Sequence, residues 1–233
     1  ISYSDSEIYV CGYTKSTDGL FSTNHGSWDG LIVKLDTSLN IKWQKNYGGS
    51  GGELFNHMIK LYNGDLAILG SASSSDFDLQ NAVHHGVGGM WVLILDSLGN
   101  MLINQTFGGT QGGYPGCLAK LNDSSVVIAG QYNNGGSYYD FHLASLGLNG
   151  SINWERNFPG NTSGVGNAVG IVSDTVGNIF VEVAGGLGNL LSGFHGGQSD
   201  VGLLKFDSNG NQIWGKCYGG SSGDYPLNIF LKN

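Results

Sequence analysis

Short apolar stretches alternate with polar turn residues along the whole chain, and one longer pattern of them occurs four times. It begins at Asp29, Gly89, Asp140 and Asp200. In each copy an Asp or Gly is followed seven residues later by Trp or Ile, and four residues after that by an aromatic residue and a pair of small residues. Ungapped matches at fixed spacing identify a repeat protein.

Each repeat has room for four β-strands. The first strand is apolar, as in residues 54–62, 116–121 and 168–173, and the second is represented near the start of the chain by residues 7–13. Turns such as Asn-Gly and Ser-Leu-Gly-Asn separate the strands. Because Asn and Gly tolerate positive φ, these turns favour β-hairpins. Each repeat therefore predicts a four-stranded antiparallel sheet.

The spacing of the repeats predicts a ring. The four markers are 60, 51 and 60 residues apart, and a further 62 residues connect the last marker to the first if the chain is treated as a circle. We therefore expect an all-β fold: a β-propeller of four-stranded antiparallel blades, with four blades and the ring closed by both termini. Residues 1–233 would form this single domain, with the recurring Trp and Tyr or Phe between the blades.

The two ends of the chain leave an alternative open. The chain starts with the end of a first strand, yet residues 225–232, which align with residues 114–121, also resemble a first strand. The four repeats are therefore either a ring with a longer loop at its seam or an excerpt of a longer array.

Composition supports many tight turns and makes some partners implausible. Gly accounts for 41 of 233 residues, charged residues for 12%, and the net charge is -8. Ten Lys and Arg residues cannot neutralise a series of phosphates, so we expect no nucleic-acid partner. No apolar run approaches the ~20 residues of a membrane-spanning helix, so we expect no membrane insertion. Cys11, Cys117 and Cys217 are interpreted as small apolar residues.

The motifs of the first repeat resemble a known family. They are Asn-His-Gly-Ser-Trp-Asp at residues 24–29, Val-Lys-Leu-Asp at 33–36, Trp43, and Tyr-Gly-Gly-Ser at 47–50. This set resembles the β-propeller repeats of large secreted and surface proteins from Gram-negative bacteria that use type IX secretion. The resemblance implies an extracellular or outer-surface location, a binding or scaffolding role, and no catalytic residues. The third repeat departs most, with Gly147 in place of Asp.

Motifs for catalysis and for metal binding are weak. Residues 48–52 and 219–223 match Gly-x-Ser-x-Gly, but no helix follows either one, as a nucleophile elbow requires. The acidic loop residues Asp18, Asp76 and Asp78 form no calcium-loop array. We therefore expect that the chain is not an enzyme, with no catalytic residue, no metal site and no cofactor.

The loops between second and third strands vary in length while the strands keep their spacing. In a propeller such loops emerge on one face, and loops on a rigid scaffold commonly carry recognition. We therefore interpret their aromatic and histidine residues as ligand contacts, although they would also serve to close the loops over the core. The candidates are Phe21, His25, Trp28, Phe77, His85, Tyr138, Tyr139, Phe194 and His195.

The leading hypothesis is a non-catalytic extracellular or cell-surface interaction module. It would bind a protein or carbohydrate partner on the cell surface, as part of a larger surface protein or assembly. The first alternative is that the repeats are structural spacer blades of a large surface adhesin or filament. The second is a carbohydrate-active enzyme that uses the central mouth of the propeller.

Overall fold

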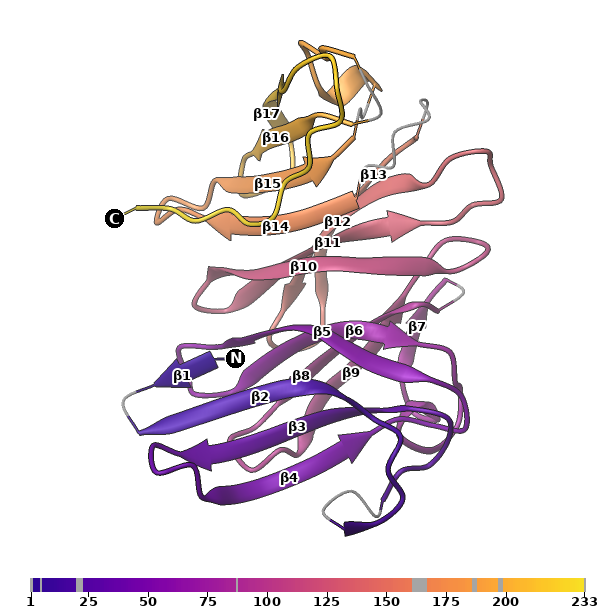
Figure 1. The fold of residues 1–233 in the computed structure, drawn as a ribbon, viewed down its shortest axis with the longest axis vertical. Coiled ribbons are helices and arrows are strands. Elements are labelled where there is room, and N and C mark those ends of the chain that lie inside the picture. Colours follow the sequence, from indigo (N-terminus) through magenta and orange to yellow (C-terminus); the bar gives the residue numbers. More distant parts are fainter. Residues whose placement is uncertain are drawn as a thin grey trace. The chain divides into compact units, whose positions relative to one another are not determined.

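The computed structural model is built of β-strands and turns, and its described residues include short 3-10 helices at Phe77–Leu79 and Gly188–Leu190. It describes residues 2–4, 6–19, 23–86, 88–160, 167–185, 188–196 and 199–232. The chain forms two compact units, Ile1–Phe107 and Gly108–Asn233, which are described here one at a time. Each unit contains two blades of antiparallel strands (Figure 1). The prediction of an all-β propeller with four four-stranded blades is confirmed.

Unit 1 contains the first and second blades, in which sequential strands pair antiparallel. A short extra strand, β7, pairs parallel with β9 at the edge of the second blade. The strands of the first blade are β1 (Ser2–Ser4), β2 (Glu7–Thr14), β3 (Asp29–Asp36) and β4 (Ile41–Tyr47). Those of the second are β5 (Glu53–Lys60), β6 (Leu66–Ala72), β7 (Val83–His85), β8 (Met90–Leu95) and β9 (Met101–Phe107).

Unit 2 contains the third and fourth blades, with the same antiparallel order. The strands of the third blade are β10 (Gly113–Asn122), β11 (Ser125–Tyr132), β12 (Asp140–Gly147) and β13 (Ile152–Phe158). Those of the fourth are β14 (Asn167–Ser173), β15 (Ile179–Ala184), β16 (Val201–Phe206) and β17 (Gln212–Tyr218). The three predicted apolar first strands are thus confirmed as β5, β10 and β14. The departure at Gly147 leaves the third sheet intact.

Each blade is built from one continuous stretch of chain. The sequence had instead predicted that one blade would combine strands from both ends of the chain. The first blade takes its first strand from β1, and residues 225–232 form no strand. Among the described residues, no sheet combines strands from both ends of the chain. The physical reason is that β1 already occupies part of the first-strand position, opposite three residues of β2. Ring closure and a single domain over residues 1–233 stay predictions.

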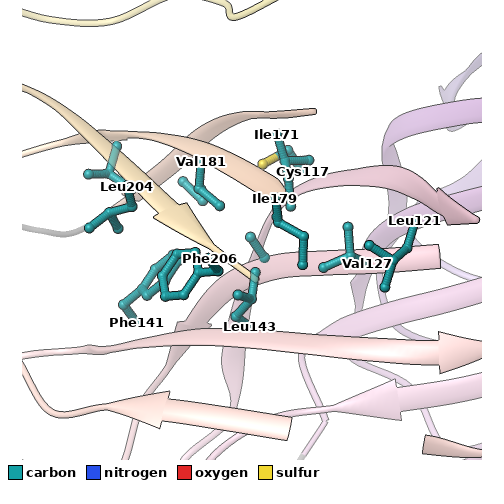
Figure 2. Close-up of a cluster of buried hydrophobic side chains, with 13 residues drawn as sticks. Cys117, Leu121, Val127, Phe141, Leu143, Ile171, Ile179, Val181, Leu204 and Phe206 are labelled. Atoms are coloured by element: carbon teal, nitrogen blue, oxygen red, sulfur yellow. The ribbon is translucent and has the colours of Figure 1, made fainter. Parts of the chain in front are cut away.

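Within each unit the two blades pack face to face. In unit 2, side chains of β10–β12 and of β14–β16 meet in one apolar cluster, which includes Val127 and Leu143 from the third blade and Val181 and Phe206 from the fourth (Figure 2). The corresponding cluster of unit 1 is centred on buried residues such as Trp91. Because each sheet has one apolar face to bury, a neighbouring blade is the natural surface to cover it.

The recurring tryptophan connects neighbouring blades. The indole N–H of Trp43 donates a hydrogen bond to the carbonyl oxygen of Ser97 (3.2 Å), and that of Trp154 donates to the carbonyl oxygen of Ser208 (2.8 Å). Both acceptors lie in the turn between the third and fourth strands of the next blade. The interpretation of these tryptophans as residues between blades is therefore confirmed within each unit.

The turns between the third and fourth strands of the first, second and fourth blades share one hydrogen-bond pattern. The carboxylates of Asp36, Asp96 and Asp207 accept bonds from the backbone N–H groups two and four residues later, and from the side chain of the Asn at the fourth position. These bonds hold the pKa of each carboxyl below its ordinary value. The residue before that Asn has a positive φ, which is +76° at Gly99 but +65° at Leu39. A non-glycine residue there costs roughly 1–2 kcal/mol.

Leu39→Gly should raise the free energy of unfolding. Relief of the left-handed conformation outweighs the added flexibility of Gly in the unfolded chain, which costs roughly 0.5–1 kcal/mol. Leu39 is 67% exposed, so little packing is lost. We expect a net gain of about 0.5–1 kcal/mol in urea denaturation. The matched control is Leu98→Gly, an equally exposed residue of the equivalent turn without a positive φ. It should give no gain, and equal effects of the two substitutions would contradict the strain at Leu39.

Candidate functional site

A groove of about 570 Å³ in unit 1 is bordered by residues that are mostly polar in type. Residues 44–47 of β4 form one part of its wall, and residues 99–101, at the turn into β9, form another. Thr23 and His25 come from the loop between β2 and β3, and Asp78 from the loop after β6. The groove thus collects side chains from both blades of this unit.

The wall formed by β4 is fastened to the second blade. The ammonium group of Lys45 donates hydrogen bonds to the carbonyl oxygen of Gly99 (2.9 Å) and to Oδ1 of Asn100 (3.3 Å). The hydroxyl of Tyr47 donates to the same Gly99 oxygen (2.7 Å). Burial raises the pKa of Tyr47, so this hydroxyl stays protonated as a donor. These three bonds hold the lining in place without a ligand.

Amide side chains are the main hydrogen-bonding groups of the groove. Asn100 donates from Nδ2 to Asp96 and accepts from Lys45, so both ends of its amide are held. The side chain of Asn46 differs, because its Nδ2 is buried and has no hydrogen-bond partner among the described residues. A buried donor without a partner costs about 1–3 kcal/mol, so this amide lowers the stability of the fold and is not open to a ligand.

His25 is held at the groove by a buried carboxylate. Oδ2 of Asp29 accepts a hydrogen bond from the His25 backbone N–H (2.9 Å) and lies 3.0 Å from Nδ1 of its ring. Asp29 is fully buried, whereas the His25 side chain is 29% exposed. Because a carboxylate only accepts, Nδ1 carries the proton, and Nε2 of the neutral ring is left as an acceptor. The ring of Phe77 packs on that of His25 with 4.8 Å between the centroids.

Asp78 adds a second ionisable group to the groove. Its Oδ2 accepts a hydrogen bond from the backbone N–H of Gly48 (3.0 Å). Burial raises the pKa of the Asp78 carboxyl, and the charge of Asp29 adds to this effect, while the Gly48 bond and His25 oppose it. An imidazole and a carboxyl with a raised pKa in one groove provide the groups needed for general acid–base chemistry.

The histidine–aspartate pair returns in the fourth blade, which indicates a structural role as well. Oδ2 of Asp200 accepts from the backbone N–H of His195 (2.7 Å) and lies 3.1 Å from its Nδ1. In the third blade, Asp140 accepts from the side chain of Asn134 instead (2.6 Å). The Asp at the start of the third strand therefore fastens the loop before it. Within unit 1, the pair in the first blade borders the groove.

The groove brings together two of the predicted contacts in unit 1, because His25 lines it and Phe77 packs on His25. Trp28 instead stacks on Tyr13 with 5.5 Å between the ring centroids. His85 stacks on the buried Phe107 at 4.9 Å, so it closes its loop over the core. The remaining candidate of this unit, Phe21, lies outside the described residues.

The predicted contacts of unit 2 lie in two loops, one before β12 and one before β16. Tyr138 is 44% exposed, and Tyr139 packs edge-on against Tyr114 at 5.2 Å. Phe194 is exposed beside His195, which is bound to its Asp. Whether the loops of all four blades share a face stays a prediction, since the units are described separately.

The groove residues Gln44, Asn46 and Asn100 were missed by the sequence analysis, which considered only the loops between second and third strands. For Asn100 there was a signal, the repeated Asp-x-x-x-Asn turn. For Asn46 the only signal in the sequence was its position next to the recurring aromatic residue Tyr47. Sequence reasoning weighed Asp78 as a calcium ligand. Across the ranges that the structure describes, no three His, Cys, Asp or Glu side chains are placed to hold a metal ion.

Comparisons with known proteins identify distant structural similarities. No protein-family model matches the chain, and no curated protein is similar in sequence. A crystal structure of a protein of unknown function from Bacteroides caccae is 11% identical, with a TM-score of 0.43, over 94% of this chain and 98% of that one. A gluconolactonase from Xanthomonas campestris is 14% identical, with a TM-score of 0.48, over 86% of this chain. The match spans 60% of the gluconolactonase chain.

The gluconolactonase match corrects the expectation that this chain is not an enzyme. That expectation depended on the absence of catalytic motifs from the sequence, and a solved structure with a related fold is an enzyme. Weak motifs therefore do not exclude catalysis here, and the likeness by itself assigns no activity. The described residues also include no helix with the length and apolar character needed to cross a membrane.

Asp78→Asn should stabilise the protein at pH 7. Asn keeps an oxygen for the Gly48 N–H and removes a charge that burial disfavours. Because the pKa of Asp78 is raised in the folded state, the protonated carboxyl stabilises the folded protein. This contribution is complete below the ordinary pKa of 3.8 and is lost as pH rises through the folded-state pKa. We therefore expect the variant to be more stable than the parent at pH 7, with the difference much smaller at pH 3, in urea denaturation.

Asp76→Asn is the matched control and should have the opposite sign. The backbone N–H of Ser50 donates to the Asp76 carboxylate (2.8 Å) and lowers its pKa. Its stabilising contribution is therefore present above the ordinary pKa and lost as pH falls. At pH 7 the control should be less stable than the parent. The same sign for both substitutions would contradict the assigned environments.

Proposed function

We propose that the groove of unit 1 binds a neutral, hydroxyl-rich ligand of the carbohydrate class. The observation that carries this proposal is the gathering of polar residues along one groove, with the exposed ring of Phe77 packed on His25 beside it. Neighbouring sugar hydroxyls both donate and accept, and Asn and Gln side chains can match both functions. The groove volume of about 570 Å³ lies within the usual range for small-ligand sites.

The charges around the groove favour a neutral ligand over an anion. The ammonium group of Lys45 already donates to Gly99 and Asn100. The carboxyl of Asp78 would repel an anion when ionised. A ligand that relies on hydroxyl groups satisfies the amides without an unpaired charge, and Phe77, 54% exposed beside His25, offers an apolar ring at the same site.

Phe77→Ala should weaken carbohydrate binding. The substitution removes the exposed ring that packs on His25 at the groove. We expect a neutral oligosaccharide, selected from a glycan array and measured by calorimetry, to bind about threefold to tenfold more weakly. The control is Phe194→Ala, which removes a similarly exposed ring beside the equivalent histidine of the fourth blade. Unchanged affinity in Phe77→Ala, or equal losses in both variants, would refute binding at this groove.

A second candidate is a carbohydrate-active enzyme that uses the same groove instead of the central mouth. It is favoured by one observation, the His25–Asp29 pair next to Asp78, whose carboxyl has a raised pKa. Nε2 of His25 would accept a proton from an attacking hydroxyl or water, and protonated Asp78 would donate one to the leaving oxygen.

His25→Gln should abolish turnover of a bound oligosaccharide while leaving its affinity within a few-fold. General acid–base groups typically contribute about 10²–10⁴ to the rate, so the loss would be clear in a product-release assay. The matched control is His195→Gln, the equivalent histidine of the fourth blade. If the parent releases no product from any oligosaccharide that it binds, or if both variants retain full turnover, this candidate is excluded.

The remaining proposals rest on the resemblance of the repeat motifs. They are an extracellular or outer-surface location, a protein partner at the cell surface, and spacer blades within a larger surface protein. Protease treatment of intact source cells tests the location, since a surface-exposed chain would be degraded and an internal one protected.

A further inference from the structure

A stacked pair of aromatic side chains lies at the end of β2 in unit 1. The rings of Tyr13 and Trp28 have 5.5 Å between their centroids and 29° between their planes. Neither residue lines the groove. Tyr13 is 55% exposed although it packs on Trp28, so a large part of its ring is open to a ligand. The pair therefore presents a flat apolar surface outside the groove.

Lys15 places a positive charge beside this surface. Its ammonium group lies 4.5 Å from the centroid of the Trp28 ring. Among the residues that the structure describes, no carboxylate pairs with this ammonium group, whereas that of Lys42 in the same blade lies 3.6 Å from Asp36. An ammonium group over an indole is attracted to the ring and keeps its charge. Lys15 can therefore still pair with an anionic group of a ligand.

The backbone on both sides of Trp28 is fixed to the start of the second blade. The N–H groups of Ser27 and Trp28 donate to the carbonyl oxygen of Gly51 (2.8 and 3.4 Å), and the carbonyl oxygen of Trp28 accepts from the N–H of Glu53 (2.8 Å). Glu53 is the fully buried first residue of β5. The indole thus extends from a backbone with little freedom to move, which lowers the entropy lost on binding.

A flat aromatic surface beside an ammonium group matches a sugar ring that carries a carboxylate. The apolar C–H face of such a ring can cover the Tyr13 side chain while its carboxylate reaches Lys15. Small aromatic acids are usually held in enclosed pockets, whereas a sugar within a longer chain can lie across an open surface. The net charge of -8 disfavours a ligand with many negative charges. Together these features favour one acidic unit within an otherwise neutral saccharide.

We propose that Tyr13, Lys15 and Trp28 form a binding site for a hexuronic acid unit of a saccharide. The sugar ring stacks on Tyr13, which is supported from behind by Trp28, and the carboxylate pairs with the ammonium group of Lys15. This site does not depend on the proposed function of the groove. It is built from other residues and prefers an acidic ligand, whereas the groove favours a neutral one.

An NMR titration of the full chain with two matched disaccharides tests this site. Cellobiouronic acid differs from cellobiose only by a carboxylate in place of one hydroxymethyl group. We expect the acid to bind about twofold to fivefold more tightly at low salt, with saturable changes at the backbone amides of residues 13–15 and 28. This preference should decrease as salt is added.

Two results of this titration would overturn the proposal. One is equal affinity for the two disaccharides. The other is the absence of saturable changes at residues 13–15 and 28. Changes confined to groove residues such as Gln44 would overturn this site and leave carbohydrate binding at the groove intact.

Lys15→Gln should remove the preference for cellobiouronic acid and leave the affinity for cellobiose unchanged. The matched control is Lys42→Gln, which removes another exposed ammonium group of the same blade. The control should keep the preference. If the preference persists in Lys15→Gln, or if both substitutions abolish it, Lys15 does not bind the carboxylate and the proposal fails.

Tyr13→Ala should weaken binding of both disaccharides about threefold to tenfold, because stacking does not depend on the carboxylate. Tyr62→Ala, which removes a tyrosine ring of the same unit that is 72% exposed, should leave both affinities unchanged. Equal effects of the two substitutions would contradict stacking on Tyr13. Benzoate is the third ligand, and tighter binding of benzoate than of cellobiouronic acid at residues 13–15 and 28 would overturn the assignment to a sugar.

Discussion

The indole hydrogen bond between neighbouring blades is the constraint on which the repeat spacing depends. Trp43 and Ser97 are 54 residues apart in unit 1, and so are Trp154 and Ser208 in unit 2. The acceptor carbonyl is available because the Asp of each turn fixes the backbone around it. A shift of the turn along the sequence would remove the carbonyl that accepts the indole hydrogen bond and the surface on which the indole packs. The number of residues between the Trp and the turn must therefore stay constant.

The same junction positions the candidate site. In unit 1, Lys45 and Tyr47 follow Trp43 on β4 and bind the turn of the second blade, which places the groove at that boundary. In unit 2, Arg156 occupies the position of Lys45 and donates to the carbonyl oxygen of Asn209 (2.8 Å). The fastening is thus a property of the repeat, whereas the amides and the acid–base pair are specific to the first groove. Side chains on such rigid elements have little freedom to move, as preorganised binding sites require.

Sequence reasoning succeeded where the determinants are local. Hairpin turns, apolar strands and the Trp between blades are all specified within one repeat, so they could be predicted. The groove could not, because Asn46, Asp78 and Asn100 are far apart in the chain and meet only through the packing of one blade on the next. The same limit applied to the ends of the chain. Two segments matched a first strand equally well, and only the structure showed that β1 takes this position while residues 225–232 form no strand.

The most direct test of the junction is a double-mutant cycle between Trp154 and Gly210. A Cβ on Gly210 would lie 2.6 Å from the Trp154 ring, and φ at Gly210 is +76°. Gly210→Ala therefore adds backbone strain and a steric clash, and only the clash depends on the indole. We predict that Gly210→Ala costs less in a Trp154→Phe background, with a coupling of about 0.5–3 kcal/mol in urea denaturation. Additive losses, with a coupling near zero, would contradict a junction built on this contact.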